Sequence, residues 1–427
     1  MDFMISDQQI IDLIKQQVVP SVGCTEPVAC ALACAKAAEI LGGQPEWIEV
    51  FVSGNIYKNG MGVGIPGTGM TGLPVAAALG GICGKSEYGL EVLKEVNDRS
   101  LALAKAMLGE RRVAIKVKEE CPDNLYVEAL CRKGTDEVRV EIVHQHSNIV
   151  LVEKNGAVLF RKEILPEENV EEKPVPDLSV ARILEFATTA PMERLEFVLE
   201  GAQMNSAISQ FGLSQEHGLQ IGKKMKEQIE SGLLSDDLLS YSLMLTAAAS
   251  DARMAGCTHP VMTNSGSGNQ GITVTMPVVA AAEKLGSSRE QLVRALVISN
   301  LISIHIHSFL GHLSALCGIC LAGTGAACGI TYLMGGGITE LEFAIKNMAG
   351  NITGMVCDGA KLGCSLKVSS GVTAAIQAAL LAVGGIHIGN DGIVEEDIEK
   401  TIRNIGVIGC EGMLETDRVI LKTMLCK

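Results

Sequence analysis

The sequence predicts an α+β protein, with helices and a sheet in its amino-terminal half and a mostly helical, Gly- and Ala-rich carboxyl-terminal half that carries a candidate cluster site. Strand-like alternation runs through residues 112–160, whereas helical spacing with Gly-rich breaks follows residue 178. Between them, residues 165–177 contain three Pro and many acidic residues, which is typical of an exposed linker. We therefore expect an α+β domain over 1–164 and an all-helical domain over 178–427.

Local signals place the elements of the amino-terminal half. Ser6 or Asp7 can cap a first helix whose apolar residues recur at helical spacing, and Pro20 ends this helix. A Gly-rich loop over 58–69 leads into an Ala-rich helix. Further helices are expected over 26–41 and 87–108, and strands over 47–53, 112–119, 124–132, 136–143 and 148–160.

In the carboxyl-terminal half, Gly-rich segments are expected to separate one helix from the next. No internal sequence repeat accompanies them. These breaks are 265–271, 323–325 and 335–337.

The composition limits the classes of function. Hydrophobic residues make up 47% of the chain and aromatic residues only 3%, which indicates a large core of aliphatic side chains. The net charge of −14 argues against nucleic acid as a partner. No uninterrupted apolar run of about 18 residues is present, so no membrane partner is expected. The amino terminus does not resemble a signal peptide, which favours a cytoplasmic protein. The net charge does not exclude a small-molecule substrate, because a local site can have the opposite charge. The Ala, Gly and Met content leaves a homodimer open.

The most informative segment is Cys357–Cys364, where two thiols lie seven residues apart. Cys317 and Cys320 lie about forty residues upstream. In a chain without secretion signals, grouped thiols favour metal binding over disulfides. Iron–sulfur clusters are held by thiolates from separated segments, and a cluster with three thiolate ligands leaves one iron open as a Lewis acid. The candidate ligands are Cys317, Cys320, Cys328, Cys357 and Cys364.

Two other interpretations of these thiols stay open. Zinc sites usually show two Cys-x-x-Cys pairs, and only Cys317–Cys320 has this spacing here, so zinc is the weaker metal. A Cys-rich helical core without metal is the alternative, because Cys packs as a small hydrophobic residue.

A second candidate is Cys24, at the start of the helix expected from about residue 26. Unpaired backbone N–H groups at a helix start stabilise a thiolate, so the pKa of Cys24 is expected to be lowered. Cys24 is therefore a candidate nucleophile or general base. The alternative is a capping turn in which Thr25 is the cap and Cys24 is packing.

A third candidate is the loop from Thr263 to Gly271. Its consecutive Gly and Ser residues expose backbone N–H groups that can hold a carboxylate or phosphate, whereas the simpler interpretation is a turn between helices. Asp251, Arg253 and His259 lie just upstream and could complete such a site.

The histidines form a fourth group. His144 and His146 end a predicted strand, where residues two apart share one face. His305, His307 and His312 precede Cys317. We expect one His that handles protons or contacts substrate, with His146 and His307 as the candidates.

Several strings together resemble the iron–sulfur L-cysteine desulfidases and the related L-serine dehydratases. The resemblance covers nearly the whole chain. It is carried by Ser21–Pro27, Tyr57–Gly60, Asp251–Met254, Ser265–Gly271, Leu316–Gly318 and Cys357–Cys364.

The resemblance implies a 4Fe–4S cluster held by Cys317, Cys357 and Cys364, with one open iron, and Cys24 as the base. It implies conversion of L-cysteine and water to pyruvate, hydrogen sulfide and ammonia, with L-serine dehydration by the same cluster as the alternative. Substrate contacts are expected from Lys58, Asn264, Ser265, Ser267 and Asn269.

Two other classes of protein are also open from the sequence. A pyridoxal-phosphate lyase would use Lys361 or Lys58 as its Schiff-base amine and the Ser265–Gly271 loop for phosphate. A non-enzymatic thiol or metal sensor would need the thiols alone.

Overall fold

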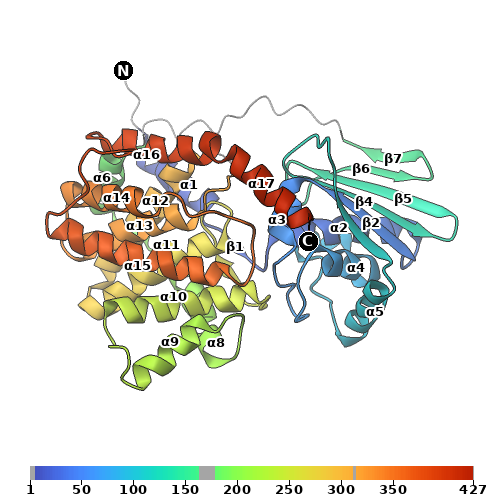
Figure 1. Cartoon of the computed structure of the whole chain (residues 1–427), viewed down its shortest axis with the longest axis horizontal. Helices are drawn as coiled ribbons and strands as arrows, with labels where there is room; N and C mark the ends of the chain where they lie inside the picture. Colours follow the sequence, from blue (N-terminus) through green and yellow to red (C-terminus); the bar gives the residue numbers. More distant parts are fainter. Residues whose placement is uncertain (1–4, 163–177, 311–313, 427) are drawn as a thin grey trace.

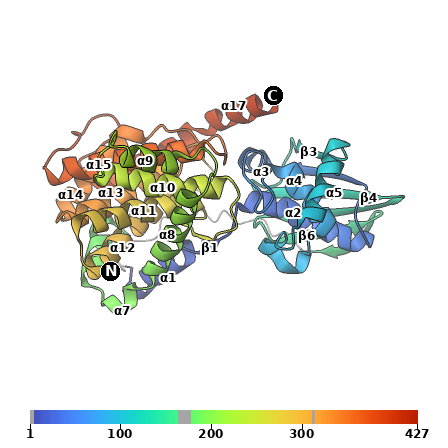
Figure 2. The same ribbon diagram turned by 90° about the horizontal axis from the view of Figure 1, so that it is seen from below.

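The α+β class predicted from the sequence is confirmed by the computed structural model, which describes residues 5–162, 178–310 and 314–426 (Figure 1). A six-stranded sheet with its helices forms one half, and a helical bundle forms the other (Figures 1 and 2). The predicted linker 165–177 and His312 lie outside the described residues.

The sheet has the strand order β3-β2-β4-β5-β6-β7. Its central strand β2 pairs parallel with β3 and antiparallel with β4, and the remaining pairs are antiparallel. Small Ala and Cys side chains of α2 pack against one face of the sheet, and α4 extends this layer. The strands are β2 (Trp47–Val52), β3 (Val113–Val117), β4 (Tyr126–Lys133), β5 (Asp136–Val143), β6 (Ile149–Lys154) and β7 (Ala157–Arg161). The helices of this half are α2 (Thr25–Leu41), α3 (Gly54–Gly60), α4 (Leu73–Cys83) and α5 (Asp98–Gly109).

Two predictions in this half were wrong in detail. The strand expected over 148–160 is the hairpin β6–β7, because Asn155 and Gly156 adopt positive φ angles of 50° and 82° and reverse the chain. The helix expected over 87–108 is a short 3-10 helix, η1 (Ser86–Glu91), followed by α5, whose start is capped by the Asn97 side chain.

The second half is a bundle whose central helices are buried on nearly all sides. Nearly all residues of α11 and α13 and most residues of α12 are buried. The predicted break at 323–325 was wrong, since these residues lie inside α13. A Cβ at Gly325 would lie 2.2 Å from the Ser299 carbonyl oxygen of α12, so Gly325 permits close helix packing. The helices are α6 (Val180–Thr189), α7 (Met192–Leu195), α8 (Val198–Ser214), α9 (Ile221–Glu230), α10 (Leu238–Met254), α11 (Gly268–Leu285), α12 (Arg289–His307), α13 (Ile319–Leu333), α14 (Ile338–Ile352), α15 (Cys364–Val383) and α16 (Ile398–Val407).

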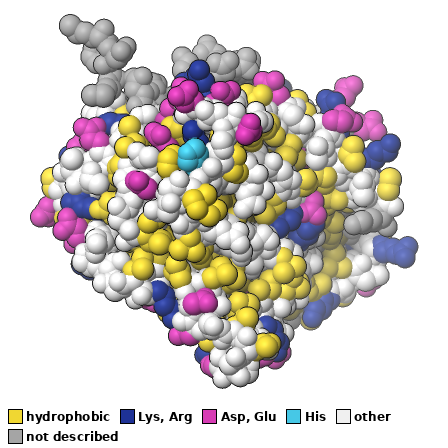
Figure 3. Space-filling view, turned by 60° about the vertical axis from the view of Figure 1, so that its left-hand side comes forward, with side chains coloured by type: hydrophobic (Ala, Val, Ile, Leu, Met, Phe, Trp, Pro, Cys, Tyr) yellow, Lys and Arg dark blue, Asp and Glu magenta, His cyan; other side chains and the backbone are white. Residues whose placement is uncertain are grey.

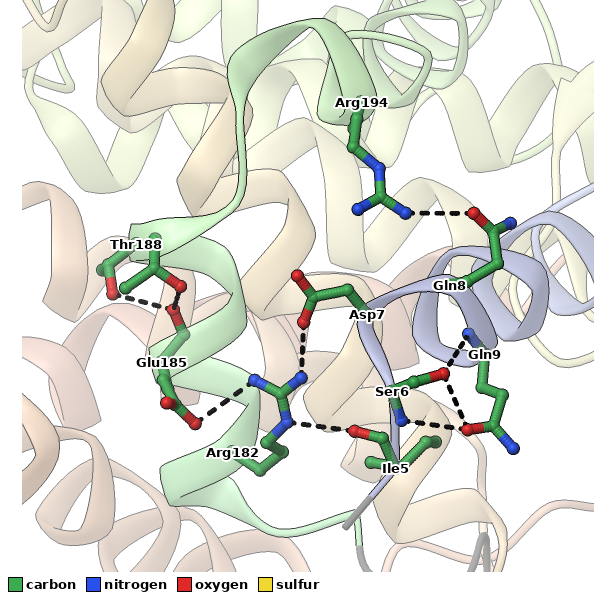
Figure 4. Close-up of polar contacts among 10 residues, drawn as sticks. Ile5, Ser6, Asp7, Gln8, Gln9, Arg182, Glu185, Thr188 and Arg194 are labelled. Carbon is green, nitrogen blue, oxygen red and sulfur yellow. Dashed lines mark hydrogen bonds and ion pairs between the residues drawn. The ribbon is translucent and has the colours of Figure 1, made fainter.

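The chain begins in the helical bundle, although these residues precede the sheet in sequence. Ile10, Ile11 and Ile14 of α1 (Asp7–Gln17) are buried in the core of the bundle. Arg182 of α6 pairs with Asp7 and donates to the Ile5 carbonyl over 3.3 Å (Figure 4). Thus the first helix is anchored to an element about 175 residues later in the sequence.

Within the described residues, two segments cross between the halves. The short strand β1 (Pro20–Ser21) pairs with β8 (Val261–Met262) of the bundle, and the chain then enters α2. At the other end, the π-helical turn η2 (Ile408–Gly412) leads into α17 (Leu414–Leu425), which extends from the bundle toward α3 (Figures 1 and 2).

Hydrophobic side chains gather on one face of the bundle (Figure 3). Leu366, Leu380 and Leu381 of α15 are exposed, as is Ile386 just beyond it. Among the described residues, α15 is the one helix long and apolar enough to cross a membrane by length and composition. Half of that helix is packed inside the protein, as in the core helix of a globular domain.

Candidate functional site

A cavity of about 450 Å³ lies where the two halves meet. Its walls combine the start of α2, α3 and the turn after β5 with the Ser265 loop and the cysteine segments of the bundle. The structure therefore brings together residues that are up to 340 positions apart in sequence. The predicted site residues that line it are Cys24, Lys58, His146, Ser265, Ser267, Asn269, His307, Cys317, Cys357 and Cys364.

Four helices begin at this cavity. Cys24 caps α2, Ser267 caps α11, Gly318 caps α13, and Cys364 is the first residue of α15. Each helix start carries a partial positive charge and unpaired N–H groups. The site can therefore hold an anionic group although the chain as a whole has a net charge of −14.

Backbone pairing holds two of the three predicted thiol ligands side by side. The Cys317 N–H donates to the Met355 carbonyl over 2.8 Å, and the Cys357 N–H donates to the Ala315 carbonyl over 2.6 Å. An antiparallel bridge joins the residues between these bonds. Cys317 and Cys357 therefore lie on adjacent extended segments, with Cys364 on the same cavity.

Lys367 provides positive charge beside these thiols. Its Nζ donates to the Val356 carbonyl over 2.7 Å and to Asp358 over 2.6 Å. Burial raises the pKa of the Cys317 thiol, and the charge of Lys367 opposes that shift. A cation in this position stabilises thiolates, as a thiolate-ligated cluster requires.

The other two candidate ligands do not line the cavity. Cys320 donates to the Ile352 carbonyl over 3.0 Å, and Cys328 is buried in the bundle core. Both thiols therefore act as packing residues.

Within the described ranges, no three His, Cys, Asp or Glu side chains lie close enough together to hold one metal ion. Cys317, Cys357 and Cys364 all line the cavity. The protein ligands of an iron–sulfur cluster bind different metal atoms, so three such ligands need not meet at one point.

Cys24 is held by a cation from the bundle. The Arg253 Nη2 lies 3.2 Å from the Cys24 Sγ and 3.4 Å from the Gly23 carbonyl oxygen. Gly268 provides room for this side chain, since a Cβ there would lie 2.2 Å from the Arg253 Nε. The Nε has no hydrogen-bond partner.

The predicted lowering of the Cys24 pKa was wrong. Burial raises the pKa of the thiol to about 11, and Arg253 offsets only part of this effect. The helix start alone does not compensate for the loss of water around a thiolate.

The Ser265 loop is a tight turn before α11. Ser265 and Gly266 have positive φ angles of 47° and 76°. The N–H of Ser265 is bonded to the Gln17 carbonyl and that of Ser267 to the Asn264 carbonyl, so these two predicted anion donors are already used. Ser265, Ser267, Asn269 and Gln270 still line the cavity, and the buried Gln270 Oε1 has no partner. The Asn269 amide also contacts Ser250 and Met254 in the bundle.

Asn264 does not line the cavity. Its side chain is fully buried and donates to the Asn300 Oδ1 over 3.0 Å, while its own oxygen accepts from Ser265 and Ser303. Asn264 thus holds the loop in place on α12.

Lys58 lies in α3, inside the segment predicted to be a loop. Its side chain is only 3% exposed and forms an ion pair with Asp417 of α17. Lys361, the other lysine considered for a Schiff base, is paired with Asp358.

The histidines separate into different environments. His146 lines the cavity, and burial lowers its pKa while Glu26 opposes the shift. His144 also lines the cavity, but its φ of 67° ends the strand, so the two do not share a strand face as predicted. The His144 Nδ1 lies 2.8 Å from Asp123. His307 lines the cavity from the last residue of α12.

Other candidates lie elsewhere. The His305 Nε2 is 2.7 Å from Glu399, and the His259 ring lies 4.2 Å from that of Phe211. Asp251 accepts from the Gly222 N–H over 3.1 Å. None of these side chains lines the cavity.

Several polar residues of the wall were not predicted. Asp123 belongs to a turn and carries no motif, so nothing local identifies it. Glu26 could have been found, because it lies in the string around Cys24. The polar residues that were not singled out are Glu26, Asn55, Asn59, Asp123, Asn124 and Ser314, whereas Gln270 lies within the predicted loop from Thr263 to Gly271.

Similarity to known proteins is extensive. The family model described as serine dehydratase alpha chain matches residues 87–422. A UPF0597 protein of Oleidesulfovibrio alaskensis is 51% identical over 420 residues, which are 98% of this chain and 97% of that protein. A UPF0597 protein of Parabacteroides distasonis is 49% identical over 422 residues, 98% of each chain. The chain therefore belongs to the serine dehydratase alpha chain family.

Proposed function

We propose that the protein is a cytoplasmic, iron–sulfur-dependent lyase that converts L-cysteine and water to pyruvate, hydrogen sulfide and ammonia. The observation that carries the proposal is the meeting of Cys317, Cys357 and Cys364 with Cys24 around one cavity. Membership in the serine dehydratase alpha chain family supports a β-eliminating lyase.

The donor set fits a 4Fe–4S cluster with three protein ligands. Cys317, Cys357 and Cys364 would hold it, and Lys367 would offset part of its negative charge. When bound, the cluster would supply an open iron, a Lewis acid for the leaving sulfur or the carboxylate of the substrate.

The positive ends of four helices favour the substrate carboxylate in the cavity. Ser265, Ser267 and Asn269 offer side-chain hydrogen bonds to it from the bundle. Lys58 bounds the cavity from the opposite half. A small amino acid held between these walls would have its Cα near the start of α2.

Cys24 is placed to take the proton from the substrate Cα. The Arg253 guanidinium donates to its sulfur and thereby stabilises the thiolate that a base requires. As the Cα–H bond breaks, its electron pair forms the Cα–Cβ double bond, and the sulfur leaves with the electron pair of the Cβ–S bond. The product 2-aminoacrylate tautomerises to an imine, and water releases ammonia and pyruvate.

Anaerobic assay of the reconstituted protein tests this proposal. Sulfide and pyruvate should form in equal amounts from L-cysteine, and the protein should contain about four irons and four inorganic sulfides per chain. An iron-free protein after anaerobic reconstitution, or iron-loaded protein without either product, would contradict it.

Dehydration of L-serine is the second candidate, because the family description names serine dehydratase. The same residues would then release water in place of sulfide. Pyruvate formation from L-serine that exceeds formation from L-cysteine at equal concentration would favour this candidate. A thiol or metal sensor would bind iron and turn over neither amino acid.

A further inference from the structure

We propose that Asp417 of α17 positions Lys58 in the cavity, so that the carboxyl-terminal helix forms part of the site without touching substrate. The inference builds on the proposed function in one respect, the contact of Lys58 with an amino-acid substrate. The ion pair and the packing that carry it do not depend on that function.

The burial of Lys58 makes its partner important. Its side chain is 3% exposed, and an ammonium removed from water requires a compensating charge. Asp417 provides that charge from a helix of the opposite half and is itself 31% exposed. Removing Asp417 would leave a buried cation at the cavity wall without its counter-charge, so the Lys58 side chain would move.

The helix α17 touches α3 at two points. Leu421 packs against Gly54 at the start of α3, where an added Cβ would lie 2.5 Å from the Leu421 Cδ2. Asp417 holds Lys58 near the end of α3. Between these two points α3 contributes Asn55 and Ile56 to the cavity wall, and Asn59 follows Lys58 there.

Elsewhere on α17 the contacts are few, the main one being Ile420, which packs half-buried against the core of the bundle. None of the residues of α17 is fully buried, and Leu414, Val419 and Leu425 are exposed. A helix with few buried contacts has low local stability. Its two contacts with α3 therefore matter for both helices.

The position of Lys58 also affects the cysteine segment. Gly359 packs directly against the Lys58 carbonyl, since a Cβ there would lie 2.0 Å from that oxygen. A parallel bridge between Gly62 and Lys361 continues the contact. A change in α3 is thus transmitted to the loop between Cys357 and Cys364.

The test compares D417N with D417E and with the control E415Q in the full-length protein. Glu415 lies on the same helix, where it pairs with Arg418 at an exposed position. Amide hydrogen exchange over residues 54–60 should be faster in D417N and unchanged in E415Q. Steady-state kinetics should show KM for L-cysteine raised by about 5-fold or more in D417N, with a smaller change in kcat, and partial recovery in D417E.

The two readouts separate this inference from the proposed function. Unchanged exchange over 54–60 in D417N would overturn the inference whatever the activity. If the wild type has no lyase activity, the exchange experiment still decides the role of Asp417. Adding D417N to a K58M variant should cause little further change in exchange, because Asp417 acts through Lys58, whereas additive effects would overturn the inference. If D417N does not fold, L421A tests the second contact with the same expected exchange.

Discussion

The Arg253 guanidinium donates to the Cys24 thiol over 3.2 Å, although the two residues are 229 positions apart in sequence. The pairing of β1 with β8 holds the segment before Cys24 against the bundle, and this brings Cys24 close to Arg253. Burial of the thiol and the nearby cation act in opposite directions on its pKa. The buried Cys24 sulfur thus comes from the sheet half of the protein, and the Arg253 charge beside it comes from the bundle.

Replacing Cys24 by Ser should remove turnover but not iron. A hydroxyl cannot take over as base, and loss of a positioned base typically lowers kcat by about 10²- to 10⁴-fold. Iron content should match the wild type, since Cys24 is not one of the three expected ligands. The matched control is Cys83→Ser, whose partly buried thiol donates to the Leu79 carbonyl away from the cavity. Loss of iron in Cys24→Ser would contradict the assignment.

Replacing Cys317, Cys357 or Cys364 singly by Ala should lower the iron bound after anaerobic reconstitution. Each variant removes one thiolate from the expected set of three. Iron and inorganic sulfide measured per chain give the result. Cys320→Ala is the control, because its thiol is buried three residues from Cys317 and bonded to a backbone carbonyl. A similar loss of iron in Cys320→Ala would contradict the ligand set.

That Cys317, Cys357 and Cys364 belong together could be predicted, because these cysteines occur in short strings of the sequence, and the structure places all three on one cavity. The contact of Cys24 with Arg253 and the pairing of Lys58 with Asp417 could not be predicted, since each depends on a chain crossing between halves. The pKa of Cys24 was predicted in the wrong direction, because a sequence reveals a helix start but not the depth of burial.

Glycine caused errors of two kinds in the predicted fold. Gly325 was interpreted as a helix break, whereas it lies within a helix that packs closely on another. The Asn155-Gly156 turn was overlooked, although this dipeptide is a strong hairpin signal. The first error could not be avoided without the tertiary structure, whereas the second could.

The free energy of unfolding should decrease at acid pH, in part because the Glu128 carboxylate on the sheet becomes protonated. Burial alone would raise the pKa of Glu128, but hydrogen bonds from Lys118 and Tyr126 and the charge of Arg139 outweigh burial and lower the pKa from its usual value. A lowered pKa stabilises the folded protein above the unfolded value, and this contribution is lost as the pH falls through the folded pKa.

The free energy of unfolding, measured by urea from pH 7 to pH 3, tests this. Glu128→Gln should be less stable than the wild type at neutral pH and should show a smaller loss of stability on acidification. Glu137→Gln is the control, because its ion pair with Arg132 is exposed. Equal pH dependence in the wild type and Glu128→Gln would contradict the prediction.

The exposed apolar face of α15 should pair with the same face of a second chain. A two-fold interface brings identical surfaces together. Identical charged surfaces would repel each other, so in a chain with a net charge of −14 an uncharged surface is the one best suited to such an interface. No Asp, Glu, Lys or Arg occurs between Lys367 and Asp391. The double change Leu380→Glu and Leu381→Glu should convert a dimer to a monomer.

Light scattering coupled to gel filtration measures the mass in solution. Leu233→Glu is the control, because Leu233 is exposed at a different place, between α9 and α10. A monomeric wild type would contradict this prediction, as would a dimer that survives both changes on α15.

The packing of α1 in the helical bundle has a consequence for synthesis of the chain. During translation, Ile10, Ile11 and Ile14 emerge long before α6 and α12, the helices of the core that buries them. The sheet half, which is encoded between them, is complete while this apolar face still lacks its binding partners. The apolar face of the first helix therefore stays exposed until much later segments have left the ribosome. During that interval it is a binding site for a chaperone that recognises apolar segments of nascent chains.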